Sequence, residues 1–560
     1  MTVIDWLIVV VVNGAIIGYG MRKASDTKTS FDWFLAARGL PWWVVGLSMF
    51  ATAVDSGDYV AVAGASYQYG MSMITEWWIG LTLAWVICAY FVFLPMYRTA
   101  MFTNAEYLEY RFGTFTRTLS VLIQVQYRTN VLANVSYSLY LTFGILTGWD
   151  TWQTWILVVA IAAGAAIYTS MGGLRSVAIT DSIQSLVMLA AAIVLWFTVW
   201  NHIGGWDALE TRLDEVETNL SKTLLYVGGY SEPGAPPVLI AIGWILVLFA
   251  YCVVNHSQSM RMLASRSEWD MKMAALIASV ITVLMMWFNI TIGILGRAIF
   301  PDLEQGDQVY PQLISQFLTT GLIGIVVAGI LAGGISTFDS IGSALAAVIT
   351  RDLYARFLVP NQTDEHYLTL SKILTCLVIA VSFAYIPFLE GGMVEFYLNI
   401  TRVAVMPLFT IYLMGALTRV HRRSGTVGLI VGIGFGLSAF LGNYLDLELP
   451  IWWSNKWWGY LWSLILPASS MVLYSICYGW IPKDATQGLV FSGSSLPKEG
   501  KETTIALKDT WIERTRKSVP QMPEYPFPIP EQGIPWYLKP HLWIFAFLSV
   551  MAFLNFYLFW

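Results

Sequence analysis

The sequence predicts an all-α protein that crosses a membrane many times. Two observations lead to this fold class. Of the 560 residues, 57% are hydrophobic and only 12% are charged, whereas soluble domains carry about 25% charged residues. The apolar residues also gather in runs of about 20, which is the length that spans a bilayer as a helix. The composition therefore excludes an ordinary soluble domain, and no basic stretch suggests binding to nucleic acid.

Fourteen stretches meet the length of a membrane-spanning helix, and each is predicted as one. They are roughly residues 4–21, 41–66, 75–97, 117–146, 152–171, 178–202, 237–262, 273–299, 319–350, 369–390, 394–418, 424–446, 456–480 and 540–560. Two polar segments separate some of them. Residues 203–236 are acidic, and residues 481–539 form a long connection that is rich in proline.

The positive charges predict how the helices are oriented. If the N-terminus is outside, the short loops that face the cytoplasm contain 17 lysines and arginines, and the outer loops contain only four. Cytoplasmic loops carry the excess of these residues. We therefore predict an outer N-terminus, and with fourteen spans an outer C-terminus, in a plasma or inner membrane. Residues 481–539 are then a cytoplasmic linker.

Several charged residues lie inside the apolar stretches. A charge at the centre of a bilayer costs at least about 2.5–3.5 kcal/mol, so it persists only where it faces the protein interior or water. Several such groups in one chain mark a path for a polar or charged substance, which favours a transporter. The residues are Asp55, Asp58, Arg128, Asp181, Asp339 and Arg402.

Three motifs resemble those of one transporter family. The first is Tyr168-Thr-Ser-Met-Gly-Gly-Leu-Arg-Ser176 with Thr180-Asp181, the second is Asn104-Ala-Glu-Tyr-Leu-Glu-Tyr-Arg-Phe-Gly113, and the third is Gly333-Gly-Ile-Ser-Thr337 with Thr350-Arg-Asp-Leu-Tyr354. In this order they resemble the sodium/solute symporter family, over residues 4–480. The last helix, which follows a long polar connection, resembles the sodium/glucose cotransporter branch.

The resemblance implies a LeuT-type bundle of two five-helix repeats with inverted orientation. In such folds the binding sites lie near the bilayer midplane, where the first helix of each repeat is broken. Polar residues occupy the middle of both helices here, at Asp55-Ser-Gly-Asp58 and at Asn255-His-Ser-Gln-Ser259. The expected layout is an extra helix and loop (1–40), a first repeat (41–202), an outer loop (203–236), a second repeat (237–446), a further helical region (447–480), the linker (481–539) and a final helix (540–560).

The resemblance also implies a sodium site. Its ligands are carbonyls of Ala51, Val54 and Gly333 and hydroxyls of Ser336 and Thr337. Sodium is a hard cation, and hard cations take several oxygen ligands. The alternative is that the two hydroxyls only bond to the backbone of their own helix.

A second cation or proton site is implied at Asp181, Ser336, Asp339 and Ser340. Asp181 matches the aspartate of an extra cation site in some family members, while Asp339 stands where they have a hydroxyl. Two close carboxylates share a cation or a proton, because both cannot ionise cheaply without one. Alternatively, Asp181 caps its helix and Asp339 pairs with an arginine.

For the solute, the resemblance implies contacts from several helices. Glu76 and Asn255 match sugar-binding residues, and Asn399 stands where sugar carriers have glutamine. Asp58 stands where the sugar carriers have a histidine or a glutamine. Thr282 stands where they have a lysine.

Two arginines inside apolar stretches add a further possibility for the solute. Arg128 and Arg402 are candidate clamps for a carboxylate, because the guanidinium fork binds one bidentately. The alternative is internal pairing, Arg402 with Asp58 or Asp55 and Arg128 with another acid.

These residues predict sodium-coupled symport of a small polar solute across a lipid bilayer. A sugar, a polyol or a sugar derivative is favoured, and an organic acid or other charged metabolite is the alternative. A sensor or a channel on the same scaffold is less favoured. We predict no enzyme, because no Gly-x-Ser-x-Gly motif occurs, and no cofactor apart from Na⁺ as the coupling ion. The oligomeric state stays open.

Overall fold

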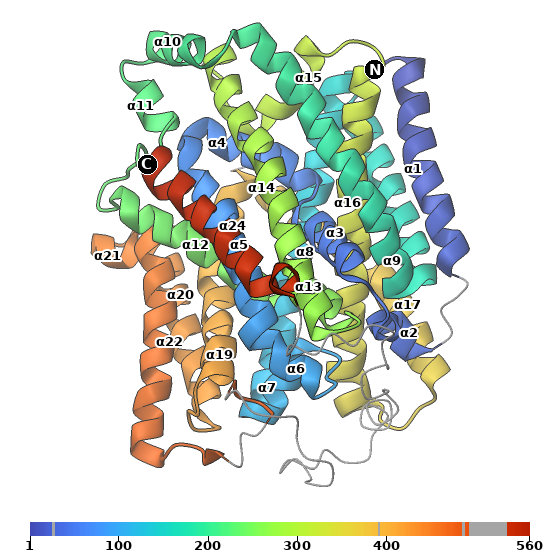
Figure 1. The fold of residues 1–560 in the computed structure, drawn as a ribbon, viewed down its shortest axis with the longest axis vertical. Helices are drawn as coiled ribbons and strands as arrows, with labels where there is room; N and C mark the ends of the chain where they lie inside the picture. The colour runs from blue at the N-terminus through green and yellow to red at the C-terminus, as the bar shows by residue number, and fades with distance from the viewer. Residues whose placement is uncertain (25–28, 390–391, 484–487, 492–534) are drawn as a thin grey trace.

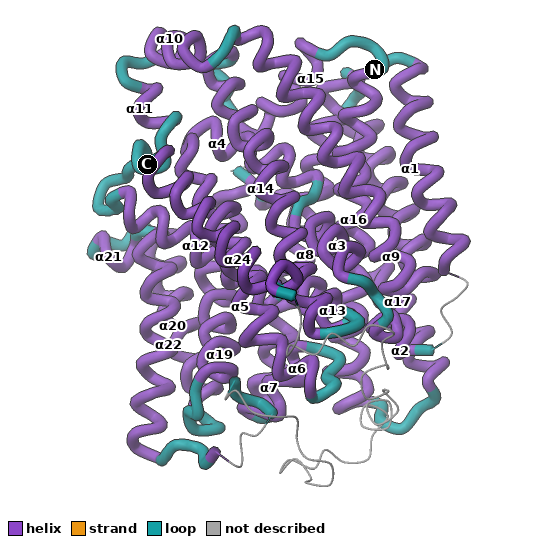
Figure 2. Tube along the Cα trace, viewed as in Figure 1, coloured by secondary structure: helices purple, strands orange, loops and turns teal. Residues whose placement is uncertain are grey.

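A computed structural model describes residues 1–24, 29–389, 392–483, 488–491 and 535–560. The described chain is a tall bundle of helices, and these residues contain no β-strand (Figures 1 and 2). Most of the predicted linker 481–539 lies outside the described residues. Each of the fourteen predicted stretches is mostly helical where it is described.

The long helices are α1 (Val3–Ala24), α8 (Thr114–Thr147), α9 (Thr151–Ile203), α12 (Pro237–Val254), α14 (Glu268–Ile299), α16 (Leu322–Val348), α17 (Asp364–Ser382), α20 (Ser424–Tyr444), α22 (Lys456–Tyr478) and α24 (Pro540–Phe553). The shorter helices are α2 (Ser30–Leu35), α3 (Trp42–Ala53), α4 (Ala63–Tyr69), α5 (Thr82–Ile87), α6 (Phe93–Arg98), α7 (Asn104–Phe112), α10 (Trp206–Val216), α11 (Leu220–Leu224), α13 (His256–Leu263), α15 (Val309–Phe317), α18 (Met393–Ile400), α19 (Met406–Leu417) and α21 (Ile451–Ser454). Short 3₁₀ or π turns are η1 (Ala36–Arg38), η2 (Asp58–Val62), η3 (Gly70–Met73), η4 (Glu76–Leu81), η5 (Cys88–Val92), η6 (Gly306–Gln308), η7 (Ile349–Leu358), η8 (Phe383–Phe388), η9 (Thr401–Val405), η11 (Trp536–Leu538) and η12 (Leu554–Leu558).

Within the described residues, eleven helices are long and apolar enough to cross a membrane. The difference from fourteen has three physical causes. Two predicted spans join in α9, which bends at Gly173, where φ is 63° and ψ is 177°. The predicted span 41–66 is divided into α3 and α4 by a break. Helix α8 is less apolar because it buries many polar side chains, among them Gln124, Arg128 and Asn134.

Two helices are broken where the sequence predicts it. Helix α3 ends at Ala53, Val54 is extended, and helical structure resumes at Ser56, just before η2. Helix α12 ends at Val254, and Asn255 has an extended conformation before α13 begins. A break frees backbone groups that a continuous helix would bond internally. These freed N–H and C=O groups are available to bind a ligand.

The bundle has two distinct ends. The N-terminal face, where α1 begins, also carries α10, α11 and α15, and the opposite face carries α2, α6 and α7 (Figure 1). The last residues of the chain are attached near the N-terminal face, because the N–H of Val227, just after α11, donates to the carbonyl of Phe559 at 2.7 Å. On the opposite face, Arg117 forms buried ion pairs with Glu109 and Asp352.

We predict that Gly173→Ala lowers the thermal stability of the purified protein. An alanine is strained at a φ of 63°, and its Cβ would lie 2.8 Å from Cδ1 of Trp33. Holding a residue in such a conformation costs about 1–3 kcal/mol. The measurement is the melting temperature in detergent, followed by tryptophan fluorescence.

Gly164→Ala in the same helix is the matched control. No heavy atom lies within 4 Å of a Cβ at Gly164, so this change should stabilise the helix by about 0.5–1 kcal/mol. Equal melting temperatures for the two variants would show that the bend at Gly173 imposes no strain.

Candidate functional site

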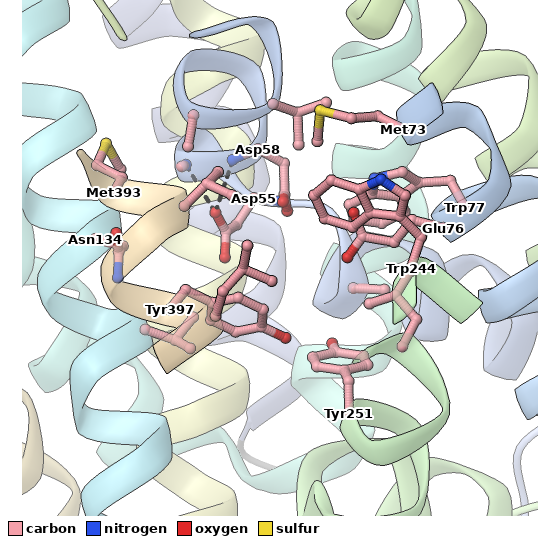
Figure 3. Close-up of a pocket in the computed structure, with 18 of the residues that line it drawn as sticks. Asp55, Asp58, Met73, Glu76, Trp77, Asn134, Trp244, Tyr251, Met393 and Tyr397 are labelled. Carbon is pink, nitrogen blue, oxygen red and sulfur yellow. Dashed lines mark hydrogen bonds between the residues drawn. The ribbon is translucent and has the colours of Figure 1, made fainter. Parts of the chain in front are cut away.

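A cavity lies beside the break between α3 and α4 (Figure 3). Its walls come from this break and from η4, α8, α12 and α18. Ligand pockets typically combine apolar walls with a few polar groups. The polar and aromatic side chains of the lining are Asp55, Asp58, Glu76, Trp77, Arg128, Asn134, Trp244, Tyr251 and Tyr397.

Asp55 and Asp58 cap the helix that resumes after the break. Oδ1 of Asp55 accepts hydrogen bonds from the backbone N–H of Gly57 at 2.7 Å and of Asp58 at 3.2 Å. Oδ2 of Asp58 accepts one from the backbone N–H of Asp55 at 2.8 Å. This reciprocal arrangement is that of a capping box. Both carboxylates are thereby held at the cavity wall.

Glu76 and Arg128 complete the charged lining. Glu76 opens η4 and Arg128 lies on α8, and both are buried. Within the described residues, Arg128 has no ion-pair partner within 4 Å, and its Nε and Nη1 atoms make no hydrogen bond. Its guanidinium lies 5.3 Å from the ring centre of Tyr251. The cavity is therefore lined by three acidic side chains and one basic side chain.

The predicted sodium ligands gather where α16 crosses the end of α3. Oγ of Ser336 lies 2.9 Å from the carbonyl of Ala51. Gly333 allows α16 to approach the break, because a Cβ there would lie 3.3 Å from the backbone of Asp55. Thr337 Oγ1 is buried beside Asp55 without a hydrogen bond of normal geometry. Val54 has an extended backbone and lies at the break that ends α3.

Two of the four residues predicted as a second cation or proton site bond an arginine. Nη2 of Arg261 donates to Oδ2 of Asp181 at 2.8 Å and to Oγ of Ser340 at 2.5 Å. Oδ1 of Asp181 accepts from Ser336 at 2.7 Å. Asp339 does not bond to this pair: Thr169 donates to its Oδ1, and its Oδ2 has no hydrogen-bond partner among the described residues. A fixed cationic side chain thus stands between Asp181 and Ser340.

A larger hollow of about 1,600 Å³ adjoins the cavity at the N-terminal face. The two share Met393 and Val394 in their walls. The backbone N–H of Met393 donates to Oδ2 of Asp307 at 3.2 Å, and burial raises the pKa of Asp307 to about 6. Exposed side chains such as Glu304 line the hollow. The cavity is therefore closer to solvent on the N-terminal face.

Comparison with known proteins identifies the kind of protein. The model of the sodium:solute symporter family matches residues 33–432. The chain belongs to this family. Its function is accordingly sodium-coupled symport of a small polar solute, and it is a multi-pass membrane protein.

Similar proteins include several named cotransporters. A sodium/glucose cotransporter 4 of Danio rerio is 23% identical over 91% of this chain and 83% of its own length. A sodium/myo-inositol cotransporter 2 of Bos taurus is 26% identical over 77% of this chain and 69% of its own length.

A solved structure of a substrate-bound, outward-open, Na⁺-coupled sialic acid symporter has a similar fold. It matches with a TM-score of 0.72 and 18% identity, and the match covers 86% of this chain and 99% of that one. The predicted LeuT-type fold is confirmed.

Three of the six residues predicted to bind the symporter's solute line the cavity, namely Asp58, Glu76 and Arg128. Asn255 lies outside the cavity lining, where its Oδ1 caps α13 by accepting from the N–H of Ser257 at 3.0 Å. Asn399 also lies outside it.

Arg402 is directed away from the cavity, and the predicted pair with Asp58 or Asp55 is not formed. Its Nη1 lies 3.4 Å from the carbonyl of Ser454, and its Nη2 lies 3.5 Å from Oδ1 of Asn399. The stem of the side chain packs on Gly459 of α22. The arginine that faces the acids of the cavity is Arg128.

Other residues of the site were not predicted. Arg261 closes the predicted span 237–262, so it was counted as a positive charge of a loop. Asn134, Trp244, Tyr251 and Tyr397 line the cavity without a motif of their own. The recurrence of polar residues every three or four positions along α8, as at Gln124, Tyr127, Asn130 and Asn134, is a usable signal for an interior face.

We predict that Arg261→Met strongly destabilises the symporter, because it leaves Asp181 buried without its cation. Breaking a buried ion pair on one side costs about 3–5 kcal/mol. Adding Asp181→Asn should recover a large part of that loss. The measurement is the melting temperature of the purified single and double variants. A double variant no more stable than Arg261→Met would contradict the pairing.

Proposed function

We propose that this symporter carries a neutral, hydroxylated solute, such as a sugar, a polyol or a sugar derivative, together with one sodium ion. The observation that carries the proposal is the balance of acidic and basic groups in the cavity. Three acidic side chains, Asp55, Asp58 and Glu76, share the described lining with one basic side chain, Arg128. An anionic solute would compete with these acids for Arg128 and sodium, whereas a neutral solute needs no cationic partner.

The hydrogen-bonding capacity of the lining agrees with hydroxyl groups on the solute. Ionised carboxylates only accept hydrogen bonds, and a guanidinium only donates them. A hydroxyl can do both, so one solute can satisfy Glu76 and Arg128 at once. Trp77 and Trp244 give the cavity flat apolar walls, suited to the apolar faces of a sugar or an inositol ring. Relatives named for glucose, myo-inositol and mannose support the same class.

We propose the sodium site at Ala51, Val54, Gly333, Ser336 and Thr337. The support is the position of Ser336 against the Ala51 carbonyl and the buried, unbonded hydroxyl of Thr337. An unbonded oxygen of this kind is costly unless a ligand uses it. The carbonyls at the break and the two hydroxyls are the hard oxygen donors that such a cation takes.

We propose that the guanidinium of Arg261 occupies the place of the second cation. Its guanidinium already neutralises Asp181 and bonds Ser340, so two of the four predicted groups are engaged. Asp339 keeps a free oxygen, but among the described residues only Thr169 bonds its carboxylate. One sodium ion per cycle follows from this arrangement.

We further propose that the N-terminal face lies outside the cell, that both termini are there, and that the protein acts only as a transporter in the cell membrane. The support is the distribution of lysine and arginine described above. In this orientation the cavity is close to the outer solution, separated from it by Met393 and Val394.

An organic acid is the second candidate solute, and one observation favours it. Arg128 is buried with two unbonded nitrogen atoms and no acid within 4 Å in the described chain. A guanidinium in that state binds a carboxylate readily. The excess of acids around the cavity opposes this candidate, so the neutral solute is preferred.

We predict that the sodium dependence of wild-type uptake has a Hill coefficient near one. Thr337→Ala should raise the half-saturating sodium concentration at least roughly tenfold, because a bond to a charged partner contributes about 1.5–3 kcal/mol. The measurement is sodium-dependent uptake into proteoliposomes, with choline as the replacement cation.

Ser343→Ala on the same helix is the control, since in the described chain that hydroxyl bonds only to carbonyls of its own helix, those of Asp339 and Ser340. It should leave the sodium dependence unchanged. Full uptake in sodium-free buffer at constant pH would contradict both the proposed sodium site and the coupling of transport to sodium.

We predict that myo-inositol, glucose or a related polyol raises the melting temperature of the purified protein in sodium, because a ligand stabilises the state that binds it. Glu76→Gln should weaken that effect at least roughly tenfold in half-saturating concentration, since a bond to a charged group is lost. Glu365→Gln, at an exposed position on α17, serves as the control. A response to organic acids alone would reverse the choice of solute.

A further inference from the structure

The helical segment that leads into η4 has two functional faces. Met73, Glu76 and Trp77 line the solute cavity (Figure 3). Their spacing of three and four residues places them on one side of the helix. Thr75 and Trp78, three residues apart, lie on another side, and neither lines the cavity. A contact made by this second side can therefore act on the cavity wall without touching the solute.

The carboxylate of Glu76 depends on the backbone of η4 for its place. The side chain is buried, and in the described chain no hydrogen bond holds its carboxylate. The carboxylates of Asp55 and Asp58, by contrast, accept hydrogen bonds from backbone N–H groups. What fixes the first turn of η4 therefore also decides where Glu76 meets the solute.

Thr75, the residue before Glu76, is bonded to a segment far away in the sequence. Its hydroxyl donates to Oδ1 of Asn555 in η12 at 3.2 Å, and Nδ2 of Asn555 donates to the same hydroxyl oxygen at 3.1 Å. Both side chains are fully buried. In a helix a threonine hydroxyl can bond the carbonyl four residues earlier. Here it bonds a second helix instead, and the reciprocal pair joins η12 to the start of η4.

Other contacts hold η12 in place beside η4. Helix α24 crosses the bundle obliquely and continues into η12 (Figure 1). The ring centre of Phe559 lies 5.5 Å from that of Trp287 on α14 and 6.2 Å from that of Trp78. The backbone of Phe559 also accepts the N–H of Val227 at 2.7 Å. Because of these contacts, η12 should stay where it is when the bond between Asn555 and Thr75 is removed.

We propose that Asn555 is a positioning residue for solute binding. Through Thr75 it fixes the first turn of η4 and with it the place of Glu76 on the cavity wall. A side-chain hydrogen bond between membrane helices contributes only modestly to stability, so its loss should leave the bundle folded and change binding severalfold. The inference rests on the solute cavity of the proposed function and is independent of the sodium site.

The test is a titration of the purified full chain with myo-inositol or glucose in saturating sodium, read from the melting temperature. Asn555→Leu should raise the half-saturating solute concentration roughly three- to tenfold. The half-saturating sodium concentration, measured without solute, should stay unchanged, because the proposed sodium ligands lie on α3, its break and α16. A role in stability alone would not separate the two titrations in this way.

The same substitution in the Glu76→Gln background shows whether Asn555 acts through Glu76. Two residues that act through one interaction are not additive. Asn555→Leu should therefore change the solute titration of Glu76→Gln less than roughly twofold. The full three- to tenfold change in that background would overturn the inference.

A double variant, Asn555→Leu with Thr75→Val, guards the test against a loss of folding. It replaces both bonded partners by apolar side chains, a change that can be nearly neutral for stability. It should show the same weakened solute response as Asn555→Leu. A wild-type solute titration in this variant would refute the positioning role.

Asn13→Leu is the matched control. Asn13 is also a buried asparagine that joins two helices, because its Nδ2 donates to the Ala328 carbonyl of α16 at 3.3 Å, but it does not line the cavity. It should keep the wild-type solute titration. An equal weakening of the solute response by Asn13→Leu would show a general effect of helix packing and would contradict the proposal.

The failure of the proposed function gives a different result. A wild-type protein that is stabilised by gluconate or succinate, but by neither polyol, rejects the neutral solute. Asn555→Leu is then titrated with that acid, and an unchanged response refutes the positioning role. A wild-type protein that responds to none of these compounds removes the cavity as their binding site and the inference with it.

Discussion

Within a bilayer every backbone N–H and C=O must find a partner inside the protein, and the rest of this structure depends on that constraint. The break after Ala53 frees groups at both of its ends. Asp55 and Asp58 satisfy the N–H groups that open the next helix, while Tyr251 satisfies the Thr52 carbonyl at the end of α3 and Ser336 lies 2.9 Å from the Ala51 carbonyl. The second break is completed in the same way, because Asn104 donates to the carbonyl of Val254 at 2.8 Å.

The functional groups follow from these caps. A residue that caps a helix break is polar, buried and fixed, which are also the properties that a binding site needs. Asp58 accepts the backbone N–H of Asp55 at the break and at the same time lines the solute cavity. Ser336 contacts the freed Ala51 carbonyl and is a proposed sodium ligand. Stability and transport therefore make the same demand on these positions, and a change at either one affects both.

Local patterns in the sequence predicted the fold and only part of the site. The lengths of the apolar runs gave the helices, and polar residues at Asp55–Asp58 and Asn255–Ser259 gave the breaks. The rotation of each helix about its axis decides which buried charges meet. A single sequence does not contain that rotation. Arg402 and Arg128 both lie inside apolar runs, yet only Arg128 faces the acids. Arg261 looked like a loop residue because it stands at the end of its run.

The two ends of the bundle are packed by different physical means. At the N-terminal face the wall shared by the cavity and the larger hollow is apolar and includes Met393 and Val394. At the opposite face Arg117 is buried between Glu109 and Asp352. A buried ion pair contributes little net stability, because its desolvation offsets its attraction. Opening that face to water would return the charges to solvent, so a closure made of ion pairs can be specific in geometry and still separate at modest net cost, as alternating access requires.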